Sequence, residues 1–220
     1  MPSRTATVTP IAEGSRQDRR RARTRAELLA AAKRLLASKG FHATKIADIS
    51  AAADVGTGTF YLHFPTKDAL FADLVKATAL RAKDEIDRAK EPYADPRDRA
   101  RVGIETFFRF AASNRDVFKI LFGHSAHFDT LLHELHQLFI ADTEENQVRG
   151  ANVGAFKPFH PAIVANAIVG ALSQVVSWWI DHEDVPVEEV THTVYCLLME
   201  GSAIKENEAV RGTAPKENPQ

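Results

Sequence analysis

The chain has 220 residues, of which 45% are hydrophobic and 26% are charged. These values are typical of a folded globular protein and exclude a wholly disordered, collagen-like or mucin-like chain. A single cysteine, Cys196, excludes an intramolecular disulfide framework and a cysteine-based zinc finger, and the first 14 residues hold no apolar segment typical of a secretory signal. We therefore expect a cytoplasmic protein of one or two domains.

The net charge of −1 hides an asymmetry along the chain. Residues 1–66 hold 11 basic and 5 acidic side chains (net +6), whereas residues 67–220 hold 17 and 24 (net −7). Six arginines lie between Arg16 and Arg25. This distribution indicates an anionic partner such as nucleic acid at the N-terminal end, although a solvated basic tail has the same composition.

Apolar residues recur at helical spacing and no long alternating strand pattern occurs, which predicts an all-α protein of about nine helices. Residues 1–21 are polar and Arg-rich and are predicted to form a flexible arm. The capping-box sequence Thr24-Arg25-Ala26-Glu27 predicts the start of the first helix, and Gly40 predicts its end. Further helices are predicted from Thr44, over 57–63, and from Lys67 to about 90.

Pro92 and Pro96 predict a break between two domains. The first is predicted over 22–82, with a helix-turn-helix motif at about 45–64. The second, over 83–206, is predicted to contain five more helices, of which the fourth opens at Pro161, and a flexible tail follows over 207–220.

Two short helices joined by Asp54-Val55-Gly56 are typical of a helix-turn-helix, and Asp tolerates the left-handed conformation that such a turn often needs. Gly58 costs about 1 kcal/mol in the second helix relative to Ala, and close approach to a DNA backbone would justify that cost. The apolar residues are predicted to face inward, which leaves exposed polar ends that can bond to phosphate at four positions: Thr57, Thr59, Tyr61 and His63. Thr57 is also a candidate for contact with a base edge.

Each of these residues has a simpler structural interpretation. Thr59 can support helix packing, Tyr61 can be a half-buried core aromatic residue, and His63 can be merely exposed.

The stretch from Gly40 to Ile49 resembles the segment that leads into the helix-turn-helix of the TetR family, and Val55–Leu70 resembles the family's recognition helix and the start of its fourth helix. The resemblance covers about residues 22–82. Two positions depart from the family pattern: Asp54, where Gly is frequent, and Gly56, where Ser is common as the helix cap. Gly is tolerated as a cap at a loss of about a few tenths of a kcal/mol.

The resemblance implies a homodimeric transcriptional repressor that binds a double-stranded DNA operator. The residues that it implies at the DNA are Thr44, Lys45, Thr57, Gly58, Thr59, Tyr61, His63 and Lys67. The arginines from Arg16 to Arg25 are expected to add phosphate or minor-groove contacts.

The resemblance also implies that the second domain binds a small effector. Nine of the 13 phenylalanines lie between Phe107 and Phe159, and an aromatic-rich helical domain suits a largely apolar or aromatic ligand, although any single phenylalanine is more simply a core residue. The candidate ligand-binding residues are Phe107, Phe108, Phe118, Phe122, His124, His127 and Phe128.

Two histidine pairs, His124/His127 and His133/His136, are candidate metal ligands by spacing. On one continuous helix His133 lies about 180° from His124, so the four side chains cannot converge. No metal or other cofactor is expected, and His124 and His127 are interpreted as polar contacts of the pocket.

The segment from Ala162 to Ile180 is long enough to span a membrane, but it contains several polar residues and Asp181 follows it, which favours a buried helix of a soluble protein. Because it is apolar all round, one face is predicted to pack on its own domain and another on a second subunit. The predicted dimer residues are Ile163, Ala167, Gly170, Gln174, Trp178, Val194, Leu197 and Leu198. A single core without a dimer is the alternative.

Three functions therefore stay open: a ligand-responsive repressor, a DNA-binding regulator without an effector, and an enzyme that uses the helical pocket. No Ser/His/Asp order, paired carboxylate motif or phosphate-binding loop stands out, so we expect no enzymatic activity.

Overall fold

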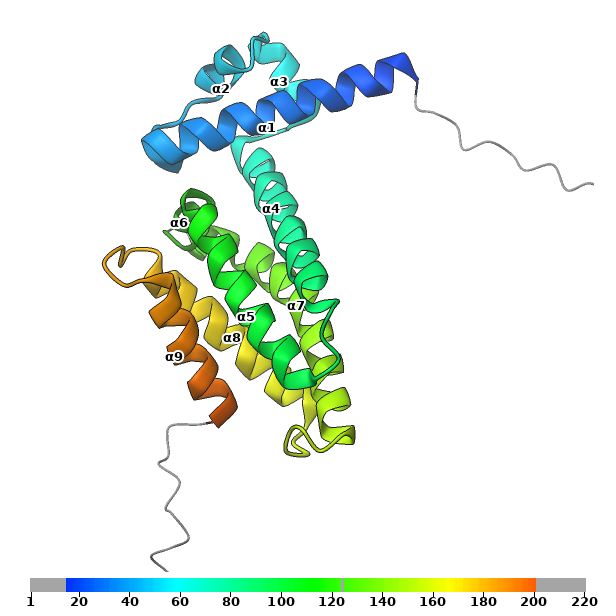
Figure 1. The fold of residues 1–220 in the computed structure, drawn as a ribbon. Coiled ribbons are helices and arrows are strands. Elements are labelled where there is room, and N and C mark those ends of the chain that lie inside the picture. Colours follow the sequence, from blue (N-terminus) through cyan, green and yellow to red (C-terminus); the bar gives the residue numbers. More distant parts are fainter. Residues whose placement is uncertain (1–14, 124, 201–220) are drawn as a thin grey trace, which may run out of the picture. The chain divides into compact units, whose positions relative to one another are not determined.

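The computed structural model describes residues 15–123 and 125–200, and the side chains of 123–129 and 200 are also outside the description. Within these residues the chain forms nine α-helices and no strand, which confirms the all-α prediction (Figure 1). The helices are α1 (Arg16–Ala43), α2 (Ile46–Ala52), α3 (Thr57–His63), α4 (Lys67–Lys90), α5 (Pro96–Ser113), α6 (Arg115–Gly123), α7 (Ser125–Asn152), α8 (Pro161–Trp179) and α9 (Val187–Glu200). The first 14 residues of the predicted arm and the predicted tail lie outside the described residues.

The described residues fall into two compact units. The first holds 15–81 and 114–135, and the second holds 82–113 and 136–200. The first domain was predicted to end at residue 82, and the chain first passes from the first unit to the second between residues 81 and 82. The sequence assigned 114–135 to the second domain, whereas in the structure this segment groups with the first unit because α6 packs against α1.

Helix α1 begins within the segment that the sequence predicted to be a flexible arm. Ser15 is its N-cap: the Asp18 amide donates to Ser15 Oγ at 3.2 Å, and the Ser15 amide donates to Asp18 Oδ2 at 2.9 Å. The capping box predicted at Thr24 is therefore wrong, because Thr24 lies inside the helix. Glu27 instead accepts a hydrogen bond from Arg23, one turn earlier, at 2.8 Å.

The predicted break at Gly40 is confirmed. Gly40 has φ +77° and ψ 170°, which interrupts the helical conformation before the last residues of α1. A positive φ of this kind favours glycine because other residues place Cβ against the backbone.

The core of the first unit is built from apolar faces of four helices. Leu28 and Leu36 of α1, Ile49 of α2, Phe60 of α3 and Phe71 of α4 are all buried. Helices α1, α2 and α3 pack together in this unit, which fixes the helix-turn-helix on a stable support (Figure 1).

The core of the second unit centres on Trp179. Its ring meets the Phe108 ring edge-to-face at 5.9 Å between centroids, and its Nε1 donates to the Val185 carbonyl at 2.9 Å. Helix α9 packs against α5 and α8 (Figure 1). Pro161 is the first residue of α8, as predicted.

Helix α8 is long and apolar enough to cross a membrane by length and composition alone. That criterion is weak, because core helices pass it as well. The helix buries Ala165, Val176 and Trp179 within the second unit and leaves another face exposed.

Candidate nucleic-acid interface

The turn between α2 and α3 has the geometry that the sequence predicted. Asp54 adopts φ +53°, the left-handed conformation, and its amide donates to the Ala51 carbonyl at 3.1 Å. The Val55 amide donates to the Ser50 carbonyl at 3.0 Å, and Gly56 is the N-cap of α3. These bonds fix the direction in which α3 leaves the turn.

The inner face of α3 is anchored by two phenylalanines. Phe60 and Phe64 are both buried, and their ring centroids lie 5.8 Å apart. The Arg25 guanidinium lies 4.9 Å from the centroid of Phe64, over its ring. This anchoring fixes the rotation of α3 about its own axis.

The outer face of α3 consists of Thr57, Gly58, Tyr61 and Leu62, all of them exposed. Thr59 and His63 are half-buried on a flank of the helix. The prediction that every second residue is exposed was therefore wrong in part, because successive helical residues turn by about 100° and the positions i, i+1, i+4 and i+5 share a face. Polarity alone missed Leu62, whereas helical spacing applied to 57–63 identifies it.

Gly58 is not required by packing inside the protein. A Cβ built at this position meets no other atom within 4 Å. The missing side chain therefore leaves open space on the exposed face, as close approach of an external partner requires.

Thr44 does not lie where the family pattern implied. Its side chain is only 1% exposed, and its hydroxyl donates to the Gly40 carbonyl at 2.7 Å. The hydroxyl satisfies a carbonyl at the end of α1, where the helix leaves such groups without intrahelical partners. Its side chain is thus engaged inside the unit instead of being presented to DNA.

Lys67 has contacts within the unit that the sequence did not predict. Its Nζ donates to the carbonyls of Phe41 at 2.7 Å and Thr44 at 3.0 Å, and it lies 4.3 Å from the centroid of the Phe41 ring. The ammonium group, which belongs to the start of α4, therefore satisfies carbonyl groups at the end of α1. Lys45, in contrast, is exposed at the N-cap of α2, as expected for a residue at the DNA.

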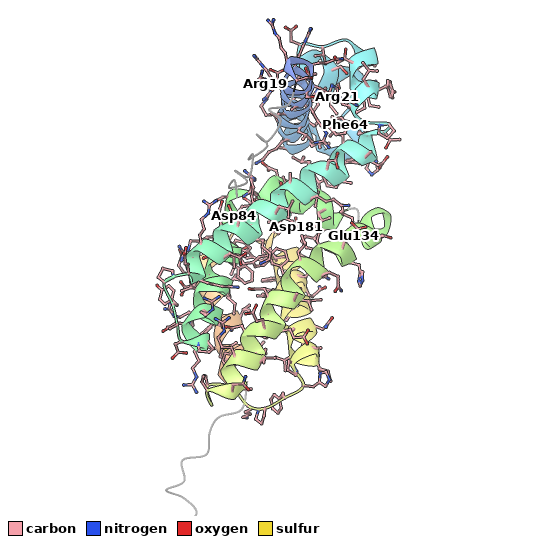
Figure 2. All side chains as sticks on the ribbon, turned by 90° about the vertical axis from the view of Figure 1, so that its right-hand side faces the viewer. Arg19, Arg21, Phe64, Asp84, Glu134 and Asp181 are labelled. Atoms are coloured by element: carbon pink, nitrogen blue, oxygen red, sulfur yellow. The ribbon has the colours of Figure 1, made fainter. Side chains whose placement is uncertain are left out.

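The arginines of α1 fall into two groups. Four are exposed along the first turns of the helix: Arg16, Arg19, Arg20 and Arg23. Arg21 and Arg25 contact α3 and the segment that follows it: Arg21 Nη2 donates to the Leu62 carbonyl at 3.5 Å, and Arg25 lies over the Phe64 ring and pairs with Asp73 of α4. Figure 2 shows Arg19 and Arg21 on the N-terminal turns of α1.

His63 lies on the flank of α3 near two of these cations. Burial, and then the charges of Arg21 and Arg25, hold the pKa of His63 below its ordinary value of 6.5. The imidazole is therefore mainly neutral at neutral pH and presents one donor and one acceptor nitrogen.

The candidate ligand-binding residues are divided between the two units. Phe108 is buried and Phe107 half-buried in the second unit, whereas Phe118 and Phe122 are half-buried in the first, with centroids 6.2 Å apart. His124 lies outside the described residues, as do the side chains of His127 and Phe128. Their assignment to one pocket stays a prediction.

Of the four histidines with metal-ligand spacing, two have described side chains. His133 is exposed, and His136 Nε2 lies 2.9 Å from Ser173 Oγ. Within 15–123 and 125–200, no group of three His, Cys, Asp or Glu side chains is arranged to hold a metal ion.

Most of the predicted dimer residues lie on an exposed face of α8. Ile163 is 67% and Trp178 48% exposed, and between them Ala167, Gly170 and Gln174 are exposed as well. On α9, Leu197 is exposed and Leu198 half-buried. Val194 is buried, as is Val190 one turn earlier, so its side chain does not belong to this exposed face.

Comparison with known proteins supports the interpretation of the first unit. Residues 28–74 match the sequence model of "Bacterial regulatory proteins, tetR family". The HTH-type transcriptional regulator EthR of Mycolicibacterium smegmatis is 38% identical over 90 residues, which is 40% of this chain and 42% of EthR. An uncharacterized HTH-type transcriptional regulator of Bacillus subtilis, YdgC, is 24% identical over 195 residues, covering 83% of this chain and 96% of YdgC.

The whole fold also has solved counterparts. FadR from Bacillus subtilis, a transcriptional regulator whose structure was determined in complex with stearoyl-CoA, superimposes with a TM-score of 0.72 at 17% identity. The match covers 81% of this chain and 99% of that chain. At this identity the likeness concerns the fold alone.

A helix-turn-helix with an anchored second helix and an exposed outer face, on an all-helical scaffold, defines a DNA-binding transcriptional regulator. Over residues 28–74 the chain matches the tetR family of bacterial regulatory proteins, and over 90 residues it is similar to EthR.

Proposed function

We propose that the protein is a homodimeric repressor that binds operator DNA through the outer face of α3. The observation that carries the proposal is the arrangement of this face: two buried phenylalanines fix it, and the same unit exposes Lys45 and four arginines of α1. Hydroxyl groups of Thr57 and Tyr61 can reach base edges or phosphates, and the cations supply the affinity that does not depend on sequence. Thr44 and Lys67 stabilise the motif through their hydrogen bonds to carbonyl groups at the end of α1.

The exposed face of α8 supports the dimer. A row from Ile163 to Trp178 combines apolar and small side chains with one amide, and the residues of 15–123 and 125–200 leave it exposed. A twofold axis through this face would pair each copy with itself, as in other symmetric dimers. Such a dimer would present two α3 helices to successive major grooves about 34–36 Å apart.

The effector is proposed to be small and largely apolar. Support comes from the phenylalanine-rich segment between Phe107 and Phe159 and, more distantly, from the fold shared with FadR, which binds stearoyl-CoA. Effector binding would weaken operator affinity only to the extent that it favours one conformation over the other. The alternative, a regulator without an effector, is favoured if no ligand that copurifies with the protein or saturates it changes operator affinity.

We further propose that the protein acts in the cytoplasm and is not an enzyme. The matched relatives EthR and YdgC are described as transcriptional regulators, which supports this assignment.

The direct test is selection of operators from a random duplex library by the purified protein. We expect an inverted repeat with half-sites about one helical turn apart. Thr57→Ala should change the preferred base at one position of each half-site, whereas Leu80→Ala, at an exposed leucine of α4, should leave the selected sequence unchanged. A library that shows no enrichment at low salt contradicts the proposal.

A further inference from the structure

The recognition helix α3 lacks the side chains that most often read bases. Its sequence, TGTFYLH, contains no Arg, Lys, Asn, Gln, Asp or Glu. The bidentate hydrogen bonds to guanine and adenine that specify most sites need Arg, Lys, Asn or Gln. Direct readout by α3 is therefore restricted to the hydroxyl groups of its exposed face, to His63 on its flank, and to apolar contact.

Leu62 is the apolar group available for such contact. At 72%, it has the highest exposed fraction among the large hydrophobic side chains in the described part of the chain. An exposed leucine alone carries little information. The position of this one is informative, because it lies on the same face as Thr57 and Tyr61, opposite the buried Phe60 and Phe64.

Gly58 lies one turn before Leu62 on the same face. The open space at its missing Cβ lets the surface of α3 approach a partner more closely than any other residue would allow, and Leu62 then projects beyond the helix surface. A glycine here costs about 1 kcal/mol of helix stability relative to alanine. Packing within the described part of the protein does not require the glycine, since an added Cβ would meet no other atom within 4 Å.

The position of Leu62 is also fixed by its neighbours. The Arg21 guanidinium donates to the Leu62 carbonyl at 3.5 Å, and Arg25 lies over the ring of Phe64, two residues later. Arg21 and Arg25 of α1 thus contact the Leu62 carbonyl and the Phe64 ring, on either side of the end of α3.

We propose that Leu62 is a specificity-determining residue that contacts the C5-methyl group of thymine in the major groove, and that Gly58 permits the approach. The inference rests on the proposed function and names the chemistry that α3 reads. Thymine is the base that presents a methyl group on this groove. Burial of one methyl-sized apolar group changes affinity by about fourfold.

The test replaces each thymine of the selected half-site, one at a time, by deoxyuridine, which removes only the methyl group. For the wild-type protein we expect at least one replacement to weaken binding by about fourfold. Leu62→Ala should bind the thymine duplex more weakly and lose its sensitivity at that same position. The matched control, Leu80→Ala, removes another exposed leucine of the same unit and should retain the wild-type sensitivity.

Two outcomes overturn the inference. In one, the wild-type protein binds the operator but tolerates uracil at every position, or the selected half-site contains no thymine. In the other, Leu62→Ala keeps the full sensitivity to loss of the methyl group. Failure to bind any duplex at low salt would contradict the proposed function itself, so the two failures are distinguishable.

Discussion

Lys67 and Thr44, two residues of the family motif, have defined roles in the fold. Both satisfy carbonyl groups where α1 ends: Lys67 bonds to those of Phe41 and Thr44, and Thr44 bonds to that of Gly40. The family resemblance implied DNA contact for both. Their contacts within the unit were not predictable, because the packing of the start of α4 against the end of α1 is a long-range feature that no local pattern encodes.

We expect Lys67→Met to lower the free energy of unfolding by about 2 kcal/mol, since two carbonyls lose a charged hydrogen-bond donor. The matched control is Lys76→Met, which removes only an exposed ion pair with Glu134 and should cost less than about 1 kcal/mol. Urea unfolding measures both. Unchanged stability together with weaker DNA binding would instead place Lys67 at the DNA.

His63 gives the first unit a pH dependence with a defined sign. Because burial, Arg21 and Arg25 hold its pKa below 6.5 in the folded state, the unfolded chain binds the proton more tightly. The resulting stability is present above about pH 6.5 and is lost as the pH falls through the lower pKa of the folded state.

Relative to wild type, His63→Gln should therefore lose less stability between pH 7 and about pH 5. Unfolding curves recorded across this range measure the difference, and titration of other groups cancels in the comparison. Parallel curves for the two proteins would show that His63 does not contribute.

At the scale of helices, local signals predicted most boundaries. Three boundaries depend only on the backbone conformation of one residue: the turn at Asp54, the break at Gly40 and the start of α8 at Pro161. The sequence alone was therefore sufficient to predict them. The start of α1 was not predictable in this way, because Ser15 and Thr24 both begin capping-box sequences and only one of them lies at a helix end.

The grouping of α6 with the first unit depends on its packing against α1, and the exposure of Leu62 depends on the rotation set by Phe60 and Phe64. Both are consequences of contacts between elements. The candidate site was thus predicted to the level of the helix, while the contacts that anchor α3 and fix its outer face required the structure.

The turn before α3 offers a test of backbone strain. Asp54 holds φ +53°, a conformation that costs non-glycine residues about 1–2 kcal/mol. We expect Asp54→Gly to raise the free energy of unfolding by about 1 kcal/mol or somewhat less, because glycine also gains entropy in the unfolded chain. Asp54→Ala retains the strain and should not be stabilising. Thermal unfolding measures both, and destabilisation by Asp54→Gly would mean that the aspartate side chain contributes more than the strain costs.

The first turns of α1 are expected to act through charge rather than sequence. Replacing Arg16, Arg19, Arg20 and Arg23 by Gln should weaken binding to every duplex by a similar factor. The slope of log affinity against log salt concentration should become less steep by about one unit for each phosphate that the variant no longer neutralises.

The matched control replaces four exposed arginines of the second unit by Gln: Arg88, Arg97, Arg109 and Arg149. Fluorescence anisotropy over a salt series measures the slopes. An equal effect of both sets would show that only the net charge matters.

For the whole molecule, the proposed dimer depends on the exposed face of α8. Trp178→Glu and Ile163→Glu should each place a charge in the proposed interface and convert the dimer to monomers at micromolar concentration, because an unpaired charge is costly to bury. Leu80→Glu, at a leucine of α4 that is 57% exposed, should remain dimeric. Sedimentation velocity measures the species, and dimeric Trp178→Glu and Ile163→Glu variants would place the interface elsewhere.

The most direct measurement is the stoichiometry of the complex with a selected operator duplex, determined by mass photometry at low salt. We expect a pair of chains on each operator, with one α3 helix for each half-site. Saturation at one chain per duplex, or no complex at all, would contradict it.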